Sequence, residues 1–134
     1  MPVIPQTNCA MIVNNASAEI VIDRDPNFDD MILVIDGERQ WGNYKLPSGA
    51  FAFVGATYSD EGPFTCDTDM GLCLTYKHND RYMEIGIPPD GGQSSANLFQ
   101  VVSDGEDGDD SSPLIYTVTD QSATSITLTF SDRS

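Results

Sequence analysis

Apolar and polar residues alternate in short runs along most of the chain. The runs are rich in β-branched and aromatic residues, and no window keeps a helical period, so the pattern predicts β-strands throughout. The nine predicted strands are residues 9–13, 18–23, 31–36, 50–56, 72–76, 82–87, 97–102, 114–119 and 125–130. In residues 82–87, Met and Ile would face one side and Tyr, Glu and Gly the other, as in a strand with one buried face.

Turn-forming residues separate these runs. They are Asn14-Asn15, Asp36-Gly37, Pro47-Ser48-Gly49, Asn79-Asp80, Pro88 to Gly92 and Gly105 to Ser112. Short strands separated by turns at such regular intervals are typical of β-sandwiches. We therefore expect residues 1–134 to form a single all-β domain, an antiparallel β-sandwich of about nine short strands. The phenylalanines inside predicted strands are expected in its core: Phe51, Phe53, Phe99 and Phe130.

The net charge narrows the classes of partner. Six Lys and Arg against 21 Asp and Glu give −15. Such a chain repels phosphate backbones, which excludes nucleic-acid binding by counterion release, and it is not drawn to anionic membranes. A lipid ligand should therefore have a neutral or zwitterionic headgroup.

The sequence shows no targeting or membrane-spanning segment. The first residues, MPVIPQTN, lack the cationic and apolar regions of a secretory signal, and no apolar run is long enough to span a bilayer. We expect a soluble chain that stays cytoplasmic until it is released.

Cysteines and acidic residues offer little metal chemistry. Cys9 and Cys73 lie in apolar runs and are expected to be small buried hydrophobic residues, although Cys66 and Cys73 could pair across a turn. A zinc site using the three cysteines and His78 would lack any CxxC pair. Residues 104–112 are rich in carboxylates but do not match an EF-hand loop, so a solvated loop is favoured over a calcium site.

No arrangement of residues points to catalysis. His78 is the single histidine, and it falls in a predicted turn, Lys77 to Asp80, where a nucleophile and an acid would have to converge on an exposed loop. We expect no enzyme and no cofactor.

Exposed aromatic residues are the better candidates for a binding site. Trp41 and Tyr44 lie in the polar segment 38–45, and Tyr58 lies in the turn-rich segment 58–63. Trp41 is either a plug that fills the core from a loop or a contact for a ligand or partner.

The order of several segments resembles the aegerolysin family of small acidic β-sandwich proteins. The segments are VNNAS, AFAFVGA, SDEGPF, MGLCLTY, YMEIGIPPDGG, NLFQVV, LIYTVT and SITLTF, and they cover most of the chain from Cys9 to Phe130. Trp41-Gly42 followed by Lys45 is similar to the family's Trp-Gly-Lys element. More distantly, Gly86 to Asp90 resembles a stretch of the actinoporins, whose long amphipathic N-terminal helix this chain lacks.

This resemblance implies a membrane-lipid or receptor-binding component of a two-component cytolysin or insecticidal toxin, which recruits a larger pore-forming partner. The expected binding surface consists of Trp41, Tyr44, Tyr58, Asp60, Pro88, Pro89 and Asp90. Two other classes stay open: a carbohydrate-binding, lectin-like module that uses the same aromatic residues, and a decoration protein of a viral capsid. Assembly into a homo-oligomer also stays open, and a broad apolar patch for it would favour the capsid alternative.

Overall fold

The computed structural model describes residues 9–28, 30–58, 70–86, 98–104, 113–122 and 125–133. These residues form eleven β-strands, and no helix occurs among them. The strands are β1 (Cys9–Asn14), β2 (Ile20–Arg24), β3 (Ile32–Ile35), β4 (Glu38–Gln40), β5 (Tyr44–Leu46), β6 (Phe51–Thr57), β7 (Met70–Tyr76), β8 (Asn79–Gly86), β9 (Gln100–Asp104), β10 (Leu114–Gln121) and β11 (Ser125–Asp132).

Each of the nine strands predicted from the alternation is present, as β1, β2, β3 and β6 to β11. Two further strands, β4 and β5, were not predicted. Each has only three residues, and a run of that length is too short to establish an alternation of apolar and polar positions.

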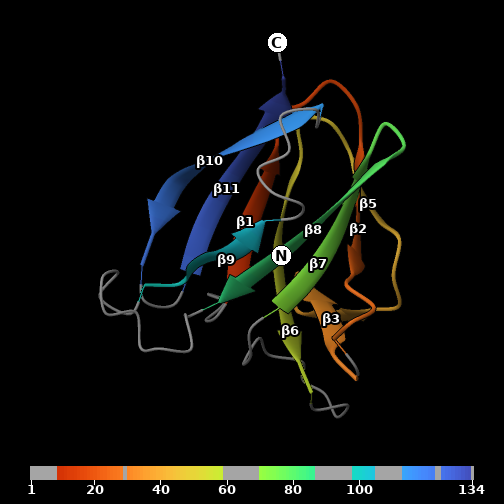
Figure 1. The fold of residues 1–134 in the computed structure, drawn as a ribbon, viewed down its shortest axis with the longest axis vertical. Helices are drawn as coiled ribbons and strands as arrows, with labels where there is room; N and C mark the ends of the chain where they lie inside the picture. Colours follow the sequence, from red (N-terminus) through yellow and green to blue (C-terminus); the bar gives the residue numbers. More distant parts are fainter. Residues whose placement is uncertain are drawn as a thin grey trace.

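The strands form two sheets. Sheet A has the order β10-β11-β1-β6-β3-β4, and sheet B has the order β5-β2-β7-β8-β9. All paired strands run antiparallel except β1 and β11, which lie side by side near the two ends of the described chain and run parallel (Figure 1). The expectation of a purely antiparallel arrangement is therefore wrong at this pair, because strands that no hairpin joins can pair in either direction.

Both sheets contribute side chains to one hydrophobic core. Ile12 and Val54 of sheet A and Ile22 and Leu72 of sheet B are completely buried in the same cluster. Neighbours in sequence on each strand face outward, as the alternation requires. The all-β, sandwich-like class predicted from the sequence is thus confirmed.

Two of the four predicted core phenylalanines lie elsewhere. Phe99 and Phe130 are buried, but Phe51 is 54% exposed and Phe53 is only half-buried. Both belong to β6, whose intervening residues Ala52 and Val54 face the core instead. The prediction went wrong because it placed the larger side chains inward, whereas the register of β6 buries the smaller ones.

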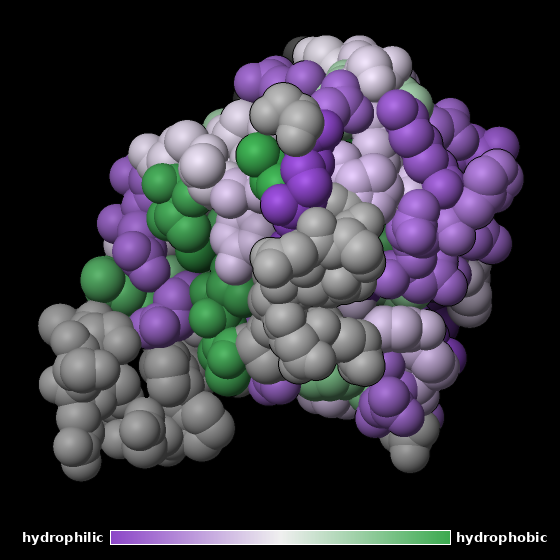
Figure 2. Space-filling model, turned by 45° about the horizontal axis from the view of Figure 1, so that its top comes forward, coloured by the Kyte–Doolittle hydropathy of each residue, from purple (hydrophilic) through white to green (hydrophobic). Residues whose placement is uncertain are grey.

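The surface is mostly hydrophilic in the view of Figure 2, where purple residues cover much of the right-hand side and green apolar residues form smaller areas on the left. Among the described residues, the large apolar or aromatic side chains that are exposed are Trp41, Phe51, Tyr58, Tyr82 and Val118.

The β7–β8 hairpin has a two-residue turn made of Lys77 and His78, with φ angles of 48° and 69°. Strand β8 begins at Asn79, which pairs with Tyr76, so the turn lies within the predicted segment Lys77 to Asp80 but two residues before the predicted pair Asn79-Asp80. The Asn79 side chain instead supports the turn by donating to the carbonyl of Lys77 at 2.9 Å.

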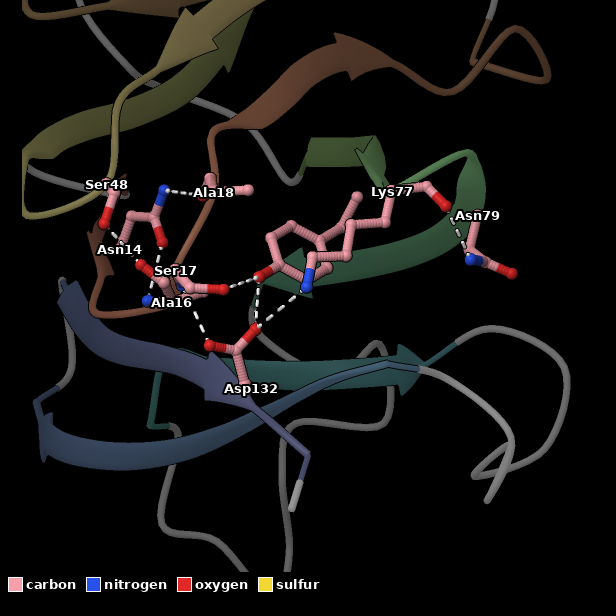
Figure 3. A network of polar contacts seen from close by, with 9 residues as sticks. Asn14, Ala16, Ser17, Ala18, Ser48, Lys77, Asn79 and Asp132 are labelled. Atoms are coloured by element: carbon pink, nitrogen blue, oxygen red, sulfur yellow. Dashed lines mark hydrogen bonds and ion pairs between the residues drawn. The ribbon is translucent and has the colours of Figure 1, made fainter.

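A buried asparagine holds the connection between β1 and β2. Asn14 is fully buried, and its Nδ2 donates to the carbonyls of Ala18 and Leu46, both at 3.0 Å. Its Oδ1 accepts from the backbone N–H of Ala16 at 2.9 Å (Figure 3). One side chain therefore ties a turn to a strand of sheet B.

Next to it, Asp132 joins the end of the chain to the β7–β8 hairpin (Figure 3). Its carboxylate accepts hydrogen bonds from the hydroxyl of Tyr76 and from the N–H of Ser17, and it lies 3.9 Å from Nζ of Lys77. These contacts, the Tyr76 hydrogen bond above all, lower the pKa of Asp132 from its ordinary value.

Candidate ligand-binding groove

Three successive segments of the chain form a groove of about 540 Å³. They are the end of β2, the stretch from residue 30 into β3, and β4 with the residues that follow it; Tyr58, just after β6, completes the lining. Small-molecule sites typically enclose volumes of this order, about 300–1,000 Å³. The lining residues are Asp23, Arg24, Asp30, Met31, Ile32, Leu33, Arg39, Gln40, Trp41, Gly42 and Tyr58.

Trp41 is the most exposed large side chain of the groove. It is 83% exposed, so it is a surface residue and does not fill the core, which was the other position compatible with the sequence. The guanidinium of Arg39 lies 3.9 Å from the centre of its ring. Such a cation–π contact, worth about 0.5–1 kcal/mol at an exposed site, restrains the indole while leaving most of it accessible to solvent.

Gly42 lets the Trp41 segment approach β2. Its φ of 121° lies in a region that other residues rarely adopt, and a Cβ at this position would lie 2.8 Å from Oδ1 of Asp23. Glycine is therefore favoured by the backbone conformation, and a Cβ here would also displace the Asp23 carboxylate.

The stretch between β2 and β3 is anchored on sheet B. The Phe28 ring occupies the space that a side chain at position 71 would need, so Gly71 is required beneath it. The N–H of Asp25 donates to the carbonyl of Gly71 at 2.9 Å, and Met31 N–H donates to the carbonyl of Phe28 at 3.3 Å. This anchoring places Asp30, which has a φ of 62°, at the wall of the groove.

The groove contains equal numbers of basic and acidic side chains. Arg24 and Arg39 are two of the six cationic residues of the chain, and Asp23 and Asp30 lie in the same lining. Arg24 donates to the carbonyls of Phe28 and Met31 at 3.4 Å. No carboxylate of the described residues forms an ion pair with either guanidinium, so both keep donors for a ligand.

The structure brings together only some of the residues expected at the binding surface. Trp41 and Tyr58, which is 53% exposed, line the same groove. Tyr44 does not line it: this residue pairs with Ile22 in sheet B and packs against the core. The remaining expected residues, Asp60, Pro88, Pro89 and Asp90, lie outside the described residues.

Tyr44 is half-buried against the core. Desolvation, and secondly the nearby carboxylate of Asp36, raise the pKa of its hydroxyl above the ordinary value.

The two cysteines among the described residues, Cys9 and Cys73, lie on different sheets. Neither is in a disulfide, and they occupy outward positions of sheet A and sheet B, respectively. Cys73 is only half-buried, so the expectation of a fully buried residue holds for Cys9 alone. Desolvation and the charge of Asp80 raise the pKa of the Cys73 thiol, which makes it a weak nucleophile.

The other metal candidates are not supported by the described part of the chain. No group of three or more His, Cys, Asp or Glu residues is arranged for a metal ion there. Cys66 and residues 105–112 of the acidic loop lie outside the described residues. His78 lies in the β7–β8 turn and is exposed.

Sequence reasoning missed all four charged residues of the groove, Asp23, Arg24, Asp30 and Arg39. Arg39 lies in β4, and Trp41 directly follows this strand. Residues two positions apart in an extended chain point to the same face, so the sequence could have suggested their stacking. For Arg24 and Asp30 the sequence carries no such signal, since their approach to Trp41 depends on how the end of β2 and the stretch before β3 pack against the residues after β4.

Comparisons with known proteins find no match, whether with family models, curated proteins or solved structures. The resemblance to the aegerolysins thus rests on the sequence segments alone and stays a prediction. Among the described residues, the search for a helix with the length and apolar character to cross a membrane finds none.

Proposed function

We propose that this chain is the non-enzymatic, membrane-binding component of a two-component pore-forming cytolysin, with an aegerolysin-like sandwich, and that the groove beside Trp41 binds a lipid headgroup. The observation that carries the proposal is the 83% exposure of a tryptophan at the wall of a charged groove. An indole that is restrained but open to solvent suits the interface between water and a membrane, where its apolar ring and its N–H both find partners.

The charges of the groove favour a zwitterionic headgroup. Two arginines and two aspartates give the groove a formal charge of zero within a chain of −15. Guanidinium groups donate to phosphate oxygens, often in pairs, whereas carboxylates and aromatic faces attract an ammonium group. A headgroup that carries only negative charge would face Asp23 and Asp30 as well as the acidic surroundings.

The net charge of the chain also favours a second protein that inserts into the membrane. Carboxylates are expensive to bury in a bilayer, and this chain has 21 of them against six basic residues. A chain of this kind can dock on a membrane and recruit a larger pore-forming partner, as the resemblance implies.

The proposal can be tested by sedimentation with vesicles made of phosphatidylcholine, sphingomyelin with cholesterol, ceramide phosphoethanolamine or phosphatidylserine. We expect binding to at least one zwitterionic vesicle and weaker binding to phosphatidylserine. The double variant Arg24→Gln/Arg39→Gln should lose at least tenfold in affinity. The control Lys45→Gln/Arg133→Gln removes the same charge away from the groove and should bind as the parent chain does.

Two outcomes would contradict the proposal. One is the absence of binding to every vesicle, and the other is an equal loss in both double variants, which would indicate an effect of overall charge alone. A glycan array run beside the vesicles separates the lectin alternative, which predicts retention of a sugar by the Trp41 groove and no affinity for lipid. Release of a trapped dye by the chain alone would contradict the division of labour between two proteins.

A further inference from the structure

A positive and a negative side chain both lie beside Trp41 in the groove. The guanidinium of Arg39 is 3.9 Å from the centre of the Trp41 ring. The carboxylate of Asp23 lies against Gly42, the next residue, so closely that a Cβ there would be 2.8 Å from its Oδ1. All four residues line the groove. A cation and an anion are therefore held at defined places next to one exposed indole.

Arg39 keeps its donors for an anion. Its side chain is half-buried, and among the described residues neither an ion pair nor a hydrogen bond engages its guanidinium. Because the central carbon of the guanidinium is at van der Waals distance from the centre of the Trp41 ring, the group meets the ring with its flat face. Its N–H groups lie in the plane of the guanidinium, so they stay open to the two oxygens of a phosphate.

Arg24 has a different role in the same groove. Its Nη1 donates to the carbonyls of Phe28 and Met31, both at 3.4 Å. Part of this guanidinium therefore holds the stretch between β2 and β3 that forms a wall of the groove. Arg39 has more unused donors and is the better site for the negative group of a ligand.

Asp23 provides the negative end of the site. Its Oδ1 accepts the backbone N–H of Arg24 at 2.8 Å, which fixes the carboxylate in place. Within the described part of the chain, no ion pair neutralises it. Trp41 remains 83% exposed although Arg39 lies over its ring, so most of the indole is open to a ligand. A cation bound here would be attracted both by the aromatic ring and by the carboxylate.

We propose that Trp41 is the centre of a dipolar site, in which Arg39 binds the phosphate of the ligand and Asp23, together with the indole, binds its ammonium group. This assignment rests on the headgroup binding proposed above and gives each half of the headgroup its own residue. Arg39 is the anion pole of the site and Asp23 is the cation pole. Each pole should bind a simple ion of the opposite charge, even without a lipid tail.

Titrations followed by Trp41 fluorescence test the two poles with inorganic phosphate, with tetramethylammonium, and with phosphocholine, which carries both charges. Trp41 is the only tryptophan in the sequence, so its emission reports on this site. Sodium chloride keeps the ionic strength constant, because a chain of charge −15 attracts cations over its whole surface. Phosphocholine should bind with a dissociation constant on the order of 1–10 mM, and more tightly than either ion alone.

Two variants should change the ion preference in opposite directions. Arg39→Gln should bind inorganic phosphate about fivefold more weakly than the parent chain, but tetramethylammonium at least as tightly. Asp23→Asn, which keeps an oxygen for the N–H of Arg24, should show the reverse. The controls Lys45→Gln and Asp120→Asn make the same two changes of net charge at residues that do not line the groove, and they should bind both ions as the parent does.

Opposite changes of preference support the proposal, because a distorted groove would weaken the binding of both ions in both variants. The proposal is overturned if either ion leaves the emission of the parent chain unchanged up to about 100 mM, or if a variant weakens both ions equally. Circular dichroism checks that the variants are folded, and either folded variant alone decides the pole that it removes.

The same titrations separate this site from the proposed function. A parent chain that binds zwitterionic vesicles but neither ion would overturn the dipolar site and leave membrane binding in place. A parent chain that shows the predicted ion preferences but binds no vesicle would keep the site and contradict the membrane-binding function.

Discussion

Replacement of Asn14 by alanine should destabilise the fold more than any other single loss of a polar side chain that we consider. The side chain is fully buried and makes three hydrogen bonds to the backbone, at 2.9 to 3.0 Å. Alanine would leave the N–H of Ala16 and the carbonyls of Ala18 and Leu46 without these partners. The bonds to Ala16 and Leu46 are buried, whereas the one to Ala18 is only partly buried, so water can replace it.

The expected cost follows from this count. An unsatisfied buried polar group costs about 1–3 kcal/mol. Two such groups, with a smaller contribution from the third, predict a loss of about 3–4 kcal/mol in the free energy of unfolding. That is a large share of the 5–15 kcal/mol that holds a domain of ordinary stability together, so the midpoint of urea unfolding should fall clearly.

Asn79→Ala is the matched control. Asn79 also donates to a backbone carbonyl, that of Lys77 at 2.9 Å, but its side chain is exposed. Its loss should cost less than about 1 kcal/mol because water can take its place. The reasoning would be refuted if urea unfolding, followed by circular dichroism, gave Asn14→Ala a cost no larger than that of Asn79→Ala.

Three further predictions concern other parts of the fold. Gly42→Ala should lose about 2 kcal/mol of stability and weaken ligand binding. The control Gly49→Ala, also at positive φ but with open space around it, should lose only about 1 kcal/mol of stability. Equal losses of stability in thermal unfolding would rule out the contact of position 42 with Asp23. His78→Gly should gain about 0.5–1 kcal/mol because its φ is 69°, while His78→Ala, which keeps the strain, should show no gain in the same unfolding assay. The folded state lowers the pKa of Asp132, so the contribution of its carboxylate to stability is present above the unfolded pKa of about 3.9 and is lost as the pH falls through the folded pKa. The unfolding free energy, measured from acid to neutral pH, should lose this pH dependence in Asp132→Asn. Parallel pH curves for the parent and Asp132→Asn would contradict it.

The short apolar runs rich in β-branched and aromatic residues were sufficient to predict nine strands, each of which is at least four residues long in the structure. They could not assign the buried face of β6. Phe51 and Phe53 occupy one set of alternate positions and Ala52 and Val54 the other, so both faces are apolar and the sequence does not distinguish them.

The candidate site was predictable only in part. The polar context of Trp41 allowed an exposed position, but a core position was equally compatible with it. The groove depends on how Arg24 at the end of β2, Asp30 before β3 and Tyr58 after β6 reach the same place, and on the contact between Gly42 and Asp23. Contacts of this kind are set by the packing of two sheets, which no local pattern encodes.

The most direct test of headgroup binding uses Trp41 itself, since it is the only tryptophan in the sequence and its fluorescence reports on its surroundings without a label. Titration with phosphatidylcholine or sphingomyelin–cholesterol vesicles should shift its emission to shorter wavelength as the 83% exposed indole leaves water. The shift should be absent in Arg24→Gln/Arg39→Gln. An emission spectrum that stays unchanged while the parent chain sediments with the vesicles would contradict the account, because membrane binding would then occur through another surface.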